Sequence, residues 1–325
     1  MFDITGLFTK ESLVRELKQL PVLKTPVMDA VFVNRPQLPL AMVSADMISE
    51  VARELPVVQR GGMSIAAGPS SGTMTWYEPL PIRPYKMITG ADLNNIQALS
   101  HTSLQAWAAQ KIDYLRRSCR KTAEAMCAVS LSGTLTWPVK VEAGGWESWS
   151  ISYGSALSVT PAKLWSADGV KLKDVYVLLQ SMEEKLQEKG YGGTLEIWAG
   201  KTAYEALFAI AEASTTTAKI RVELSDQGIN IGGYLIKRRA ETYRNPQTLA
   251  TTYIQGVKVL RMIALDAEHT MPYCALDDLD ANLHPLPFFT KPISMKDPSG
   301  YKIVGESKPF PIPNMDGVCE ATVTA

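Results

Sequence analysis

The sequence of 325 residues has no excess of charge of either sign, since 33 Lys and Arg residues balance 33 Asp and Glu residues. Proteins that bind nucleic acid over much of their surface need an excess of cationic side chains, because phosphate contacts dominate that affinity. The balance excludes such a protein and leaves room only for a locally basic face. A zero net charge also removes repulsion between copies, which favours self-association.

Long hydrophobic runs are also absent: no apolar run approaches the roughly 18 residues that a membrane-spanning helix needs. The first six residues contain neither the basic nor the hydrophobic region of a secretory signal. We expect a soluble chain that is intracellular at synthesis. A hydrophobic content of 46% allows a sizeable core, and the length indicates about two domains.

Cysteine and histidine are scarce. No Cys-x-x-Cys pair occurs, and the cysteines are Cys119, Cys127, Cys274 and Cys319. The first two lie about 12 Å apart on one predicted helix, which is too far for a disulfide. We expect free cysteines in a reducing compartment. The histidines, His101, His269 and His284, lack the His-Glu-x-x-His spacing of a zinc helix.

The first ninety residues do not form a compact unit on their own. Residues 13–20 have helical spacing of apolar side chains, Pro21 and Pro26 favour an extended chain, and residues 29–33 are typical of a short strand. Residues 36–90 are rich in proline and glycine, and they contain two predicted strands, 63–66 and 73–77, joined by a turn. Because an isolated two-stranded ribbon is marginally stable in water, this long hairpin indicates a partner surface.

Residues 102–129 form the strongest predicted helix, since no Gly or Pro interrupts the chain from Thr102 to Ser132. One face is apolar, and the other is basic, with Lys111, Arg116, Arg117, Arg120 and Lys121. Two interpretations of the basic face stay open: a solvated face, or a surface that meets nucleic acid or the carboxylates of a neighbour. A hairpin follows, with alternating residues from 135 to 153 and Pro138 favouring an edge strand.

From Asp168 the pattern changes to alternating elements. A helix that stops at Gly190, a strand at 194–198, a helix at 201–213 and strands at 228–243 and 253–265 predict a compact α/β unit. The tail from 288 to 325 is predicted to be β structure. The complete chain is therefore of the α+β class.

No pattern of residues supports catalysis or a cofactor. Gly200-Lys201-Thr202 follows a strand, but a phosphate-binding loop needs a Gly at position 195, which is Leu195, so these residues are the start of a helix. The acidic residues near His284 lack the Gly and closing Glu of a calcium loop. For them we expect a solvated acidic loop, with a weak cation site as the alternative; they are Asp266, Glu268, Asp277, Asp278 and Asp280.

The order of the elements resembles that of the major capsid proteins of tailed bacteriophages, and more narrowly of the lambda-type capsid protein E family. The residues that carry this resemblance are Val57-Val58-Gln59-Arg60-Gly61-Gly62, 82–93, 194–207, Asp297-Pro298-Ser299-Gly300, 308–313 and Val318-Cys319-Glu320-Ala321. The resemblance implies the Hong Kong 97-type fold. It divides the chain into an N-terminal arm (1–35), an extended E-loop hairpin (36–90), a peripheral domain with a spine helix (91–167), an axial domain (168–272) and a return to the peripheral domain (273–325).

The resemblance implies a protein that is not an enzyme and has no cofactor. It would assemble as hexamers and pentamers into an icosahedral shell around double-stranded DNA, with scaffolding, portal and decoration proteins as partners. The alternatives are an encapsulin-like nanocompartment and a small-molecule-binding or hydrolytic α/β domain. The predicted assembly contacts are Arg60, Gly61, Gly62, Trp76, Tyr77, Arg116, Arg117 and Arg120. Trp146 and Trp149 are either core residues or further anchors in a neighbouring subunit.

Overall fold

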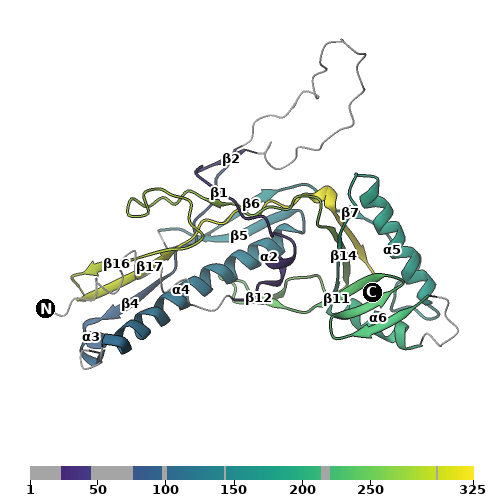
Figure 1. The fold of residues 1–325 in the computed structure, drawn as a ribbon, viewed down its shortest axis with the longest axis horizontal. Helices are drawn as coiled ribbons and strands as arrows, with labels where there is room; N and C mark the ends of the chain where they lie inside the picture. The colour runs from purple at the N-terminus through teal and green to yellow at the C-terminus, as the bar shows by residue number, and fades with distance from the viewer. Residues whose placement is uncertain (1–22, 45–75, 97–100, 143, 214–219, 298) are drawn as a thin grey trace, which may run out of the picture.

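The computed structural model describes residues 23–44, 76–96, 101–142, 144–213, 220–297 and 299–325. The molecule is elongated, with a long helix along one half and a sheet covered by two helices in the other half (Figure 1). The helices are α2 (Pro26–Ala30), α3 (Gly90–Ile96), α4 (His101–Ser130), α5 (Leu172–Gln187) and α6 (Lys201–Ala213), with a 3₁₀ turn at Met315–Gly317.

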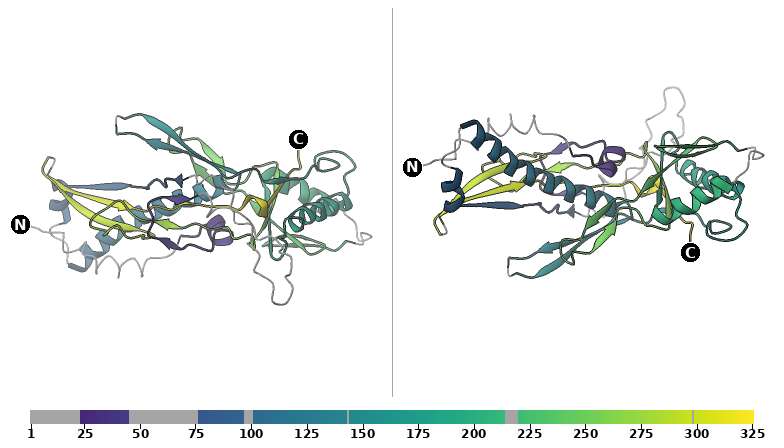
Figure 2. Two further views of the ribbon diagram at one scale, coloured as in Figure 1. Left: turned by 90° about the horizontal axis from the view of Figure 1, so that it is seen from above. Right: turned by 90° about the horizontal axis from the view of Figure 1, so that it is seen from below.

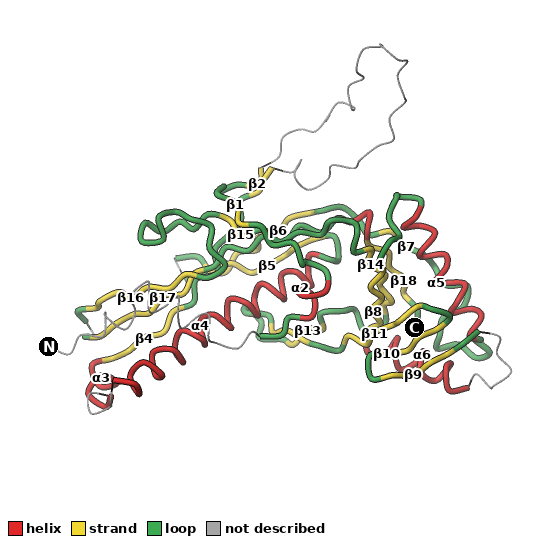
Figure 3. Tube along the Cα trace, in the orientation of Figure 1, coloured by secondary structure: helices red, strands yellow, loops and turns green. Residues whose placement is uncertain are grey.

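Within the described residues, the strands form six sheets, of which one has seven strands and one has three. Figure 3 shows how they alternate with the helices along the molecule. The strands are β1 (Gln37–Leu38), β2 (Val43–Ser44), β3 (Trp76–Tyr77), β4 (Tyr85–Thr89), β5 (Thr134–Lys140), β6 (Trp146–Ser152), β7 (Leu157–Ser158), β8 (Leu195–Gly200), β9 (Val222–Ser225), β10 (Gly228–Ile231), β11 (Tyr234–Arg239), β12 (Thr242–Arg244), β13 (Thr251–Tyr253), β14 (Val259–Ala264), β15 (Tyr273–Cys274), β16 (Phe289–Met295), β17 (Gly300–Glu306) and β18 (Val318–Thr322).

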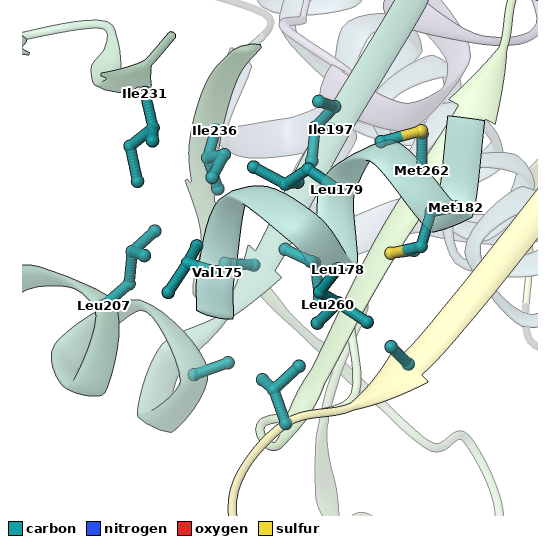
Figure 4. Close-up of a cluster of buried hydrophobic side chains, with 14 of the residues drawn as sticks. Val175, Leu178, Leu179, Met182, Ile197, Leu207, Ile231, Ile236, Leu260 and Met262 are labelled. Atoms are coloured by element: carbon teal, nitrogen blue, oxygen red, sulfur yellow. The ribbon is translucent and has the colours of Figure 1, made fainter. Parts of the chain in front are cut away.

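The largest core lies between the seven-stranded sheet and the helices α5 and α6. The strand order is β7-β18-β14-β8-β11-β10-β9. Alternate residues of the central strands, such as Ile197, Leu260 and Met262, point toward Leu179 of α5 and Leu207 of α6 (Figure 4). All five are at most 2% exposed, so this half of the molecule buries a complete core of its own.

The other half is built on α4. The three-stranded sheet β16-β17-β4 runs along the helix, and the hairpin β5–β6 leaves the body of the molecule at an angle to both (Figure 2). Between α4 and the three-stranded sheet, the buried cluster among the described residues is small: Ile88, Ala108, Ile112, Leu115 and Ile303. Two further buried clusters adjoin the rest of α4, one with Met28 and Leu131 and one with Met126 and Leu135, so the apolar burial in this half is divided among separate clusters.

Most of the predicted elements are confirmed. The predicted helix 102–129 is α4, the helix predicted at 201–213 is α6, and the hairpin after Gly133 is β5–β6. All four cysteines are free and buried. The predicted strand at 29–33 is wrong, because residues Pro26–Ala30 form the helix α2. Pro26 is the first residue of this helix. The backbone N–H that proline lacks would have no partner within the helix at this position, so Pro26 does not hold the chain extended.

The final strand, β18, lies in the seven-stranded sheet, whereas the predicted domain division assigns its residues to the peripheral domain. β18 pairs with β14 from Val259↔Thr322 to Ile263↔Val318, and with β7 on its other side. A strand from the segment 273–325 is therefore an interior member of the seven-stranded sheet, next to the edge strand β7. The other strands of this segment, β16 and β17, pair with β4 along the spine helix. The predicted domain boundaries remain a proposal.

Candidate assembly surface

The two ends of the loop 45–75 meet in the strand pair β2–β3. Val43 pairs with Tyr77 and Ser44 with Trp76, in antiparallel register. Val43 is fully buried, and the ring of Tyr77 lies 6.4 Å from that of Phe310, which is also fully buried. Apolar packing and backbone pairing therefore fix the base of this loop on the body of the molecule.

The chain on either side of this base is held by backbone hydrogen bonds to the C-terminal segment. The limb before the loop pairs through β1 with β15, and the Met271 N–H donates to the Asn34 carbonyl over 3.0 Å. The limb after the loop exchanges two hydrogen bonds between Ile82 and Ser307, of 2.8 and 3.1 Å. The residues on either side of 45–75 are therefore both attached to one body of the molecule.

Two of the predicted contact residues on α4 bind a carboxylate of their own helix. Arg116 lies 3.0 Å from one Asp113 oxygen, and Arg117 lies 2.6 Å from the other. The spacings of three and four residues put these side chains on one face of the helix. Asp113 is mostly buried, with its side chain 14% exposed, whereas that of Arg117 is 44% exposed. The chain itself thus supplies a carboxylate partner for this basic face.

Arg120 connects the spine helix to the N-terminal arm. Its guanidinium donates to the Thr25 hydroxyl over 2.7 Å and to the Asp29 carboxylate over 3.0 Å. Arg35 also donates to Asp29, over 2.9 Å. Burial alone would raise the pKa of Asp29, but hydrogen bonds from Arg35 and Thr25 and the charge of Arg120 hold that pKa below its usual value.

Glu124 lies one turn after Arg120 and caps α2. Its two carboxylate oxygens accept hydrogen bonds from the Val27 and Met28 amides, over 2.7 and 2.8 Å. These are two of the amides that a helix leaves unpaired at its N-terminus. Burial raises the pKa of Glu124, and the amide hydrogen bonds offset only part of that rise. Arg120 and Glu124 together therefore anchor the arm to α4.

Next to this anchor, a cleft of about 180 Å³ opens along α4. Arg116, Arg117 and Arg120 line one wall, and Pro287 and Phe288 belong to another. The cleft therefore combines guanidinium groups with an apolar surface, although Asp113 and Asp29 balance part of its positive charge.

The expected solvated acidic loop is confirmed in part, because Asp266, Glu268, Asp277 and Asp280 are exposed, but one member of the segment after Ala275 is buried. Asp278 is only 5% exposed, and Lys291 binds it over 2.7 Å and binds Asp280 over 2.6 Å. Lys308 binds Asp277 over 2.9 Å. Lysine side chains thus provide the cations of this cluster, and in the part of the chain that the structure describes no group of three or more acidic, His or Cys side chains could hold a metal ion.

His269 is buried where β14 meets the C-terminal segment. Its Nε2 lies 3.1 Å from the Ala264 carbonyl, and its Nδ1 accepts a hydrogen bond from the Asn314 amide over 3.2 Å. This pattern requires a neutral ring with its proton on Nε2. Burial lowers the pKa of His269 to about 4. The histidine is a structural connection between the two segments.

The structure does not bring the predicted contact residues into one site. Arg60, Gly61 and Gly62 lie outside the described residues, and Trp76 is described only through its backbone pairing. Tyr77 packs against Phe310 at the loop base. The three arginines of α4 bind Asp113, Thr25 and Asp29 of the same chain, and their role as assembly contacts stays a prediction.

Sequence reasoning missed Glu124 and Asp29. The position of Glu124 four residues after Arg120 indicates a shared helix face, but nothing local identifies a partner 96 or 97 residues earlier in the chain. Lys201 and Thr202 are confirmed as a helix start. A side chain at Gly200 would lie 2.0 Å from the Gly256 carbonyl, so this glycine allows a close backbone approach.

The chain is similar to known proteins in both sequence and fold. The family model of phage major capsid protein E matches residues 9–323. Searching the curated proteins finds no match. A solved structure of the putative capsid protein of a prophage from E. coli CFT073 has a TM-score of 0.65 at 13% identity, covering 97% of this chain and 98% of that one. This likeness shows the fold.

Two further solved structures are similar at lower scores. One, described as Mycobacterium phage Che8, has a TM-score of 0.46 at 10% identity and covers 94% of each chain. The other is the SrpI encapsulin of Synechococcus elongatus PCC 7942, with a TM-score of 0.42 at 6% identity, 96% coverage of this chain and 95% of that one. We take the fold from the prophage capsid protein alone.

The family match covers nearly the whole chain, and the fold agrees with it from the spine helix to the final strand. The expected α+β fold of the Hong Kong 97 type is confirmed. Among the described helices, none is long and apolar enough to cross a membrane. The chain belongs to the phage major capsid protein E family and is a capsid shell protein.

Proposed function

We propose that this protein assembles as hexamers and pentamers into an icosahedral shell that encloses packaged double-stranded DNA. The match to phage major capsid protein E over residues 9–323 carries the proposal. The strand pair β2–β3 and the hydrogen bonds of Asn34 and Ile82 support it, because they hold the residues on either side of 45–75 on the body of the molecule.

The role in the shell is structural, and we propose no catalytic activity and no cofactor. Scaffolding and portal proteins would act during assembly, and a decoration protein would bind the finished shell. The protein would be part of the virion after assembly in the host cytoplasm. Contact with DNA would be weak and confined to the inner face, because a net charge of zero cannot neutralise a packaged genome.

The loop residues Arg60, Gly61 and Gly62, together with Trp76 and Tyr77, remain proposed contacts with an adjacent subunit. For Arg116, Arg117 and Arg120 we propose contact with a neighbouring subunit at one defined place on the surface. Since each binds a carboxylate of its own chain, their guanidinium groups are already oriented, and they would meet a neighbour through the cleft beside Phe288.

Expression of the full chain, followed by sedimentation and negative-stain microscopy, tests the proposed function. We expect closed particles of regular size, and coexpression with a scaffolding protein from the same genome should increase their number. A chain that stays monomeric at high concentration, with and without that protein, would contradict the proposal.

A further inference from the structure

The described chain begins at the cleft that the three arginines of α4 line. Leu23, the first described residue, is half-buried and belongs to the same cleft. Another wall is apolar, because Pro287 and Phe288 form part of it. Of the described residues that line this cleft, three are cationic and none is acidic. A segment that fills it should therefore combine an apolar face with a carboxylate.

The sequence directly before Leu23 has this combination. Residues 13–20 have the apolar spacing of a helix, and the leucines that share one face of this predicted helix are Leu13, Leu17 and Leu20. At 100° per residue, Glu16 lies at the edge of the leucine face. Arg15 and Lys18 lie on the opposite face. The only charged side chain beside the leucines is thus a carboxylate.

The length of chain between the two parts favours the chain's own segment over that of a second copy. Leu20 is three residues before Leu23, and three residues of extended chain span about 10 Å. The α4 residues that line the cleft run from Arg116 to Ala123, which is about 10 Å of helix. The leucine face can therefore reach the whole cleft without leaving its own copy.

We propose that residues 13–20 form a helix that docks into this cleft of their own chain, with the leucine face on Phe288 and Glu16 paired with Arg117. The side chain of Arg117 is 44% exposed, and its Nε binds Asp113. A guanidinium group has five N–H donors, so it can bind a second carboxylate. The inference goes beyond the proposed function, because it concerns a single copy; a neighbouring subunit would meet the rim of the filled cleft.

A second hollow, on the other side of Leu23, fits the segment less well. It has a volume of about 530 Å³ and lies between α4 and the strands β12 and β13. Its lining carries charges of both signs, with Glu124 and Glu241 beside Lys121. Carboxylates in the wall repel Glu16, whereas the described lining of the arginine cleft has none.

Hydrogen exchange of the full chain tests the docking, at a concentration where sedimentation velocity shows only the monomer. Residues 13–20 should be protected. Leu17→Ser should speed their exchange about tenfold, because it removes apolar burial from the docked face. Lys18→Ser is the matched control, since it also replaces a helix-forming residue by serine but on the opposite face, and it should have little effect. Unchanged protection in β8 and β14 checks that each variant is folded.

The ion pair is tested by a double-variant cycle. Glu16→Gln and Arg117→Gln should each speed the exchange of residues 13–20 about threefold at low salt. The double variant should exchange no faster than either single one, because both changes remove the same interaction. Additive effects would show that these two side chains are not partners, which overturns the proposed orientation of the helix.

The remaining outcomes decide the inference separately from the proposed function, which is scored by particle formation. Fast exchange of residues 13–20 in the monomer would show that the segment does not dock on its own chain. Protection that appears only in assembled particles would mean that a second copy supplies the segment, which likewise overturns the inference. Equal effects of Leu17→Ser and Lys18→Ser would show that the leucine face does not make the contact.

Discussion

The two halves of the molecule are stabilised in different ways. Around the seven-stranded sheet, α5 and α6 cover one face with a continuous apolar core in which Val175, Leu179 and Met182 are fully buried. Along α4, the buried apolar residues are divided among separate clusters, and polar contacts add to them: Arg120 and Glu124 bind α2, which also packs its apolar side chains against α4, and Lys291 binds the acidic loop.

This contrast shows which half depends on its neighbours. A continuous core supplies its stability within one chain, because buried apolar area dominates the free energy of folding. Ion pairs near the surface contribute little each, and an exposed apolar face contributes only when something covers it. We infer that the sheet with α5 and α6 folds stably in a single copy, whereas the part of α4 that packs on the three-stranded sheet, where the buried cluster is small, gains its final stability in the shell.

The largest expected effect comes from Ile112→Pro. Proline removes a backbone donor and clashes with the preceding turn of α4, which costs about 3 kcal/mol or more, and the buried Ile112 side chain is lost as well. Shell formation should be abolished. Hydrogen exchange should show fast exchange in α4 with protection retained in β8 and β14; regular shells of normal size would contradict a continuous spine helix.

Leu179→Ala should lower the free energy of unfolding by about 3 kcal/mol, because it leaves a cavity in the core under α5. Urea unfolding of the unassembled protein measures this loss. Since Leu179 is fully buried and no exposed residue changes, particles that do form should have normal size. An equal loss from Val177→Ala, at an exposed position of the same helix, would mean that the core is not where the structure puts it.

His269 lies at the junction of the two halves, and it should make stability depend on pH. The pKa of His269 is about 4 in the folded protein, whereas the ordinary value of 6.5 applies to the unfolded chain. The unfolded chain therefore binds the proton more readily. The stabilisation is present above pH 6.5 and is lost as pH falls toward 4, amounting to about 2 kcal/mol between pH 7 and 5.

His269→Gln keeps one donor and one acceptor but does not titrate. The variant should therefore show a shallower fall in stability between pH 7 and 5 than the natural chain, in urea unfolding at both pH values. Parallel pH profiles for the two proteins would show that the ring titrates normally.

Glu124→Ala should cost about 1–3 kcal/mol, because the Val27 and Met28 amides lose their acceptor. The effect should be local, with faster hydrogen exchange over residues 26–33 and no change in α5. Thr122→Ala, on the same helix but with its hydroxyl bound only to the Ser118 carbonyl, is the control. Unchanged exchange in the arm would mean that apolar packing alone holds it.

The smallest expected effect is that of Arg116→Gln with Arg117→Gln. Both side chains bind Asp113 at a partly exposed site, so the loss in folding stability should be under about 1 kcal/mol. Assembly failing before packaging would identify carboxylates of a protein partner, and empty shells that form normally but lose heat stability when filled would identify DNA. If assembly and the heat stability of filled shells are both normal at low salt, Arg116 and Arg117 belong to a solvated face.

The sequence predicted what depends on local pattern. The apolar stripe of α4 and the run of Val175, Leu179 and Met182 in α5 specify their helices directly, because neighbours on a helix face are three or four residues apart. The helix α2 could not be predicted, since its amides are satisfied by Glu124 from another helix. Likewise, Asp278 is an ordinary loop residue by sequence, and only the fold brings Lys291 to it.

The position of β18 has a consequence for how the chain is made. Its partners, β7 and β14, leave the ribosome long before residues Val318–Thr322 do, so the seven-stranded sheet has an open gap between them until synthesis reaches those residues. A chain that stops early exposes the edge of β14 and the core beneath it. We therefore expect a chain that ends before Val318 to be excluded from a growing particle, because its largest sheet and core are incomplete.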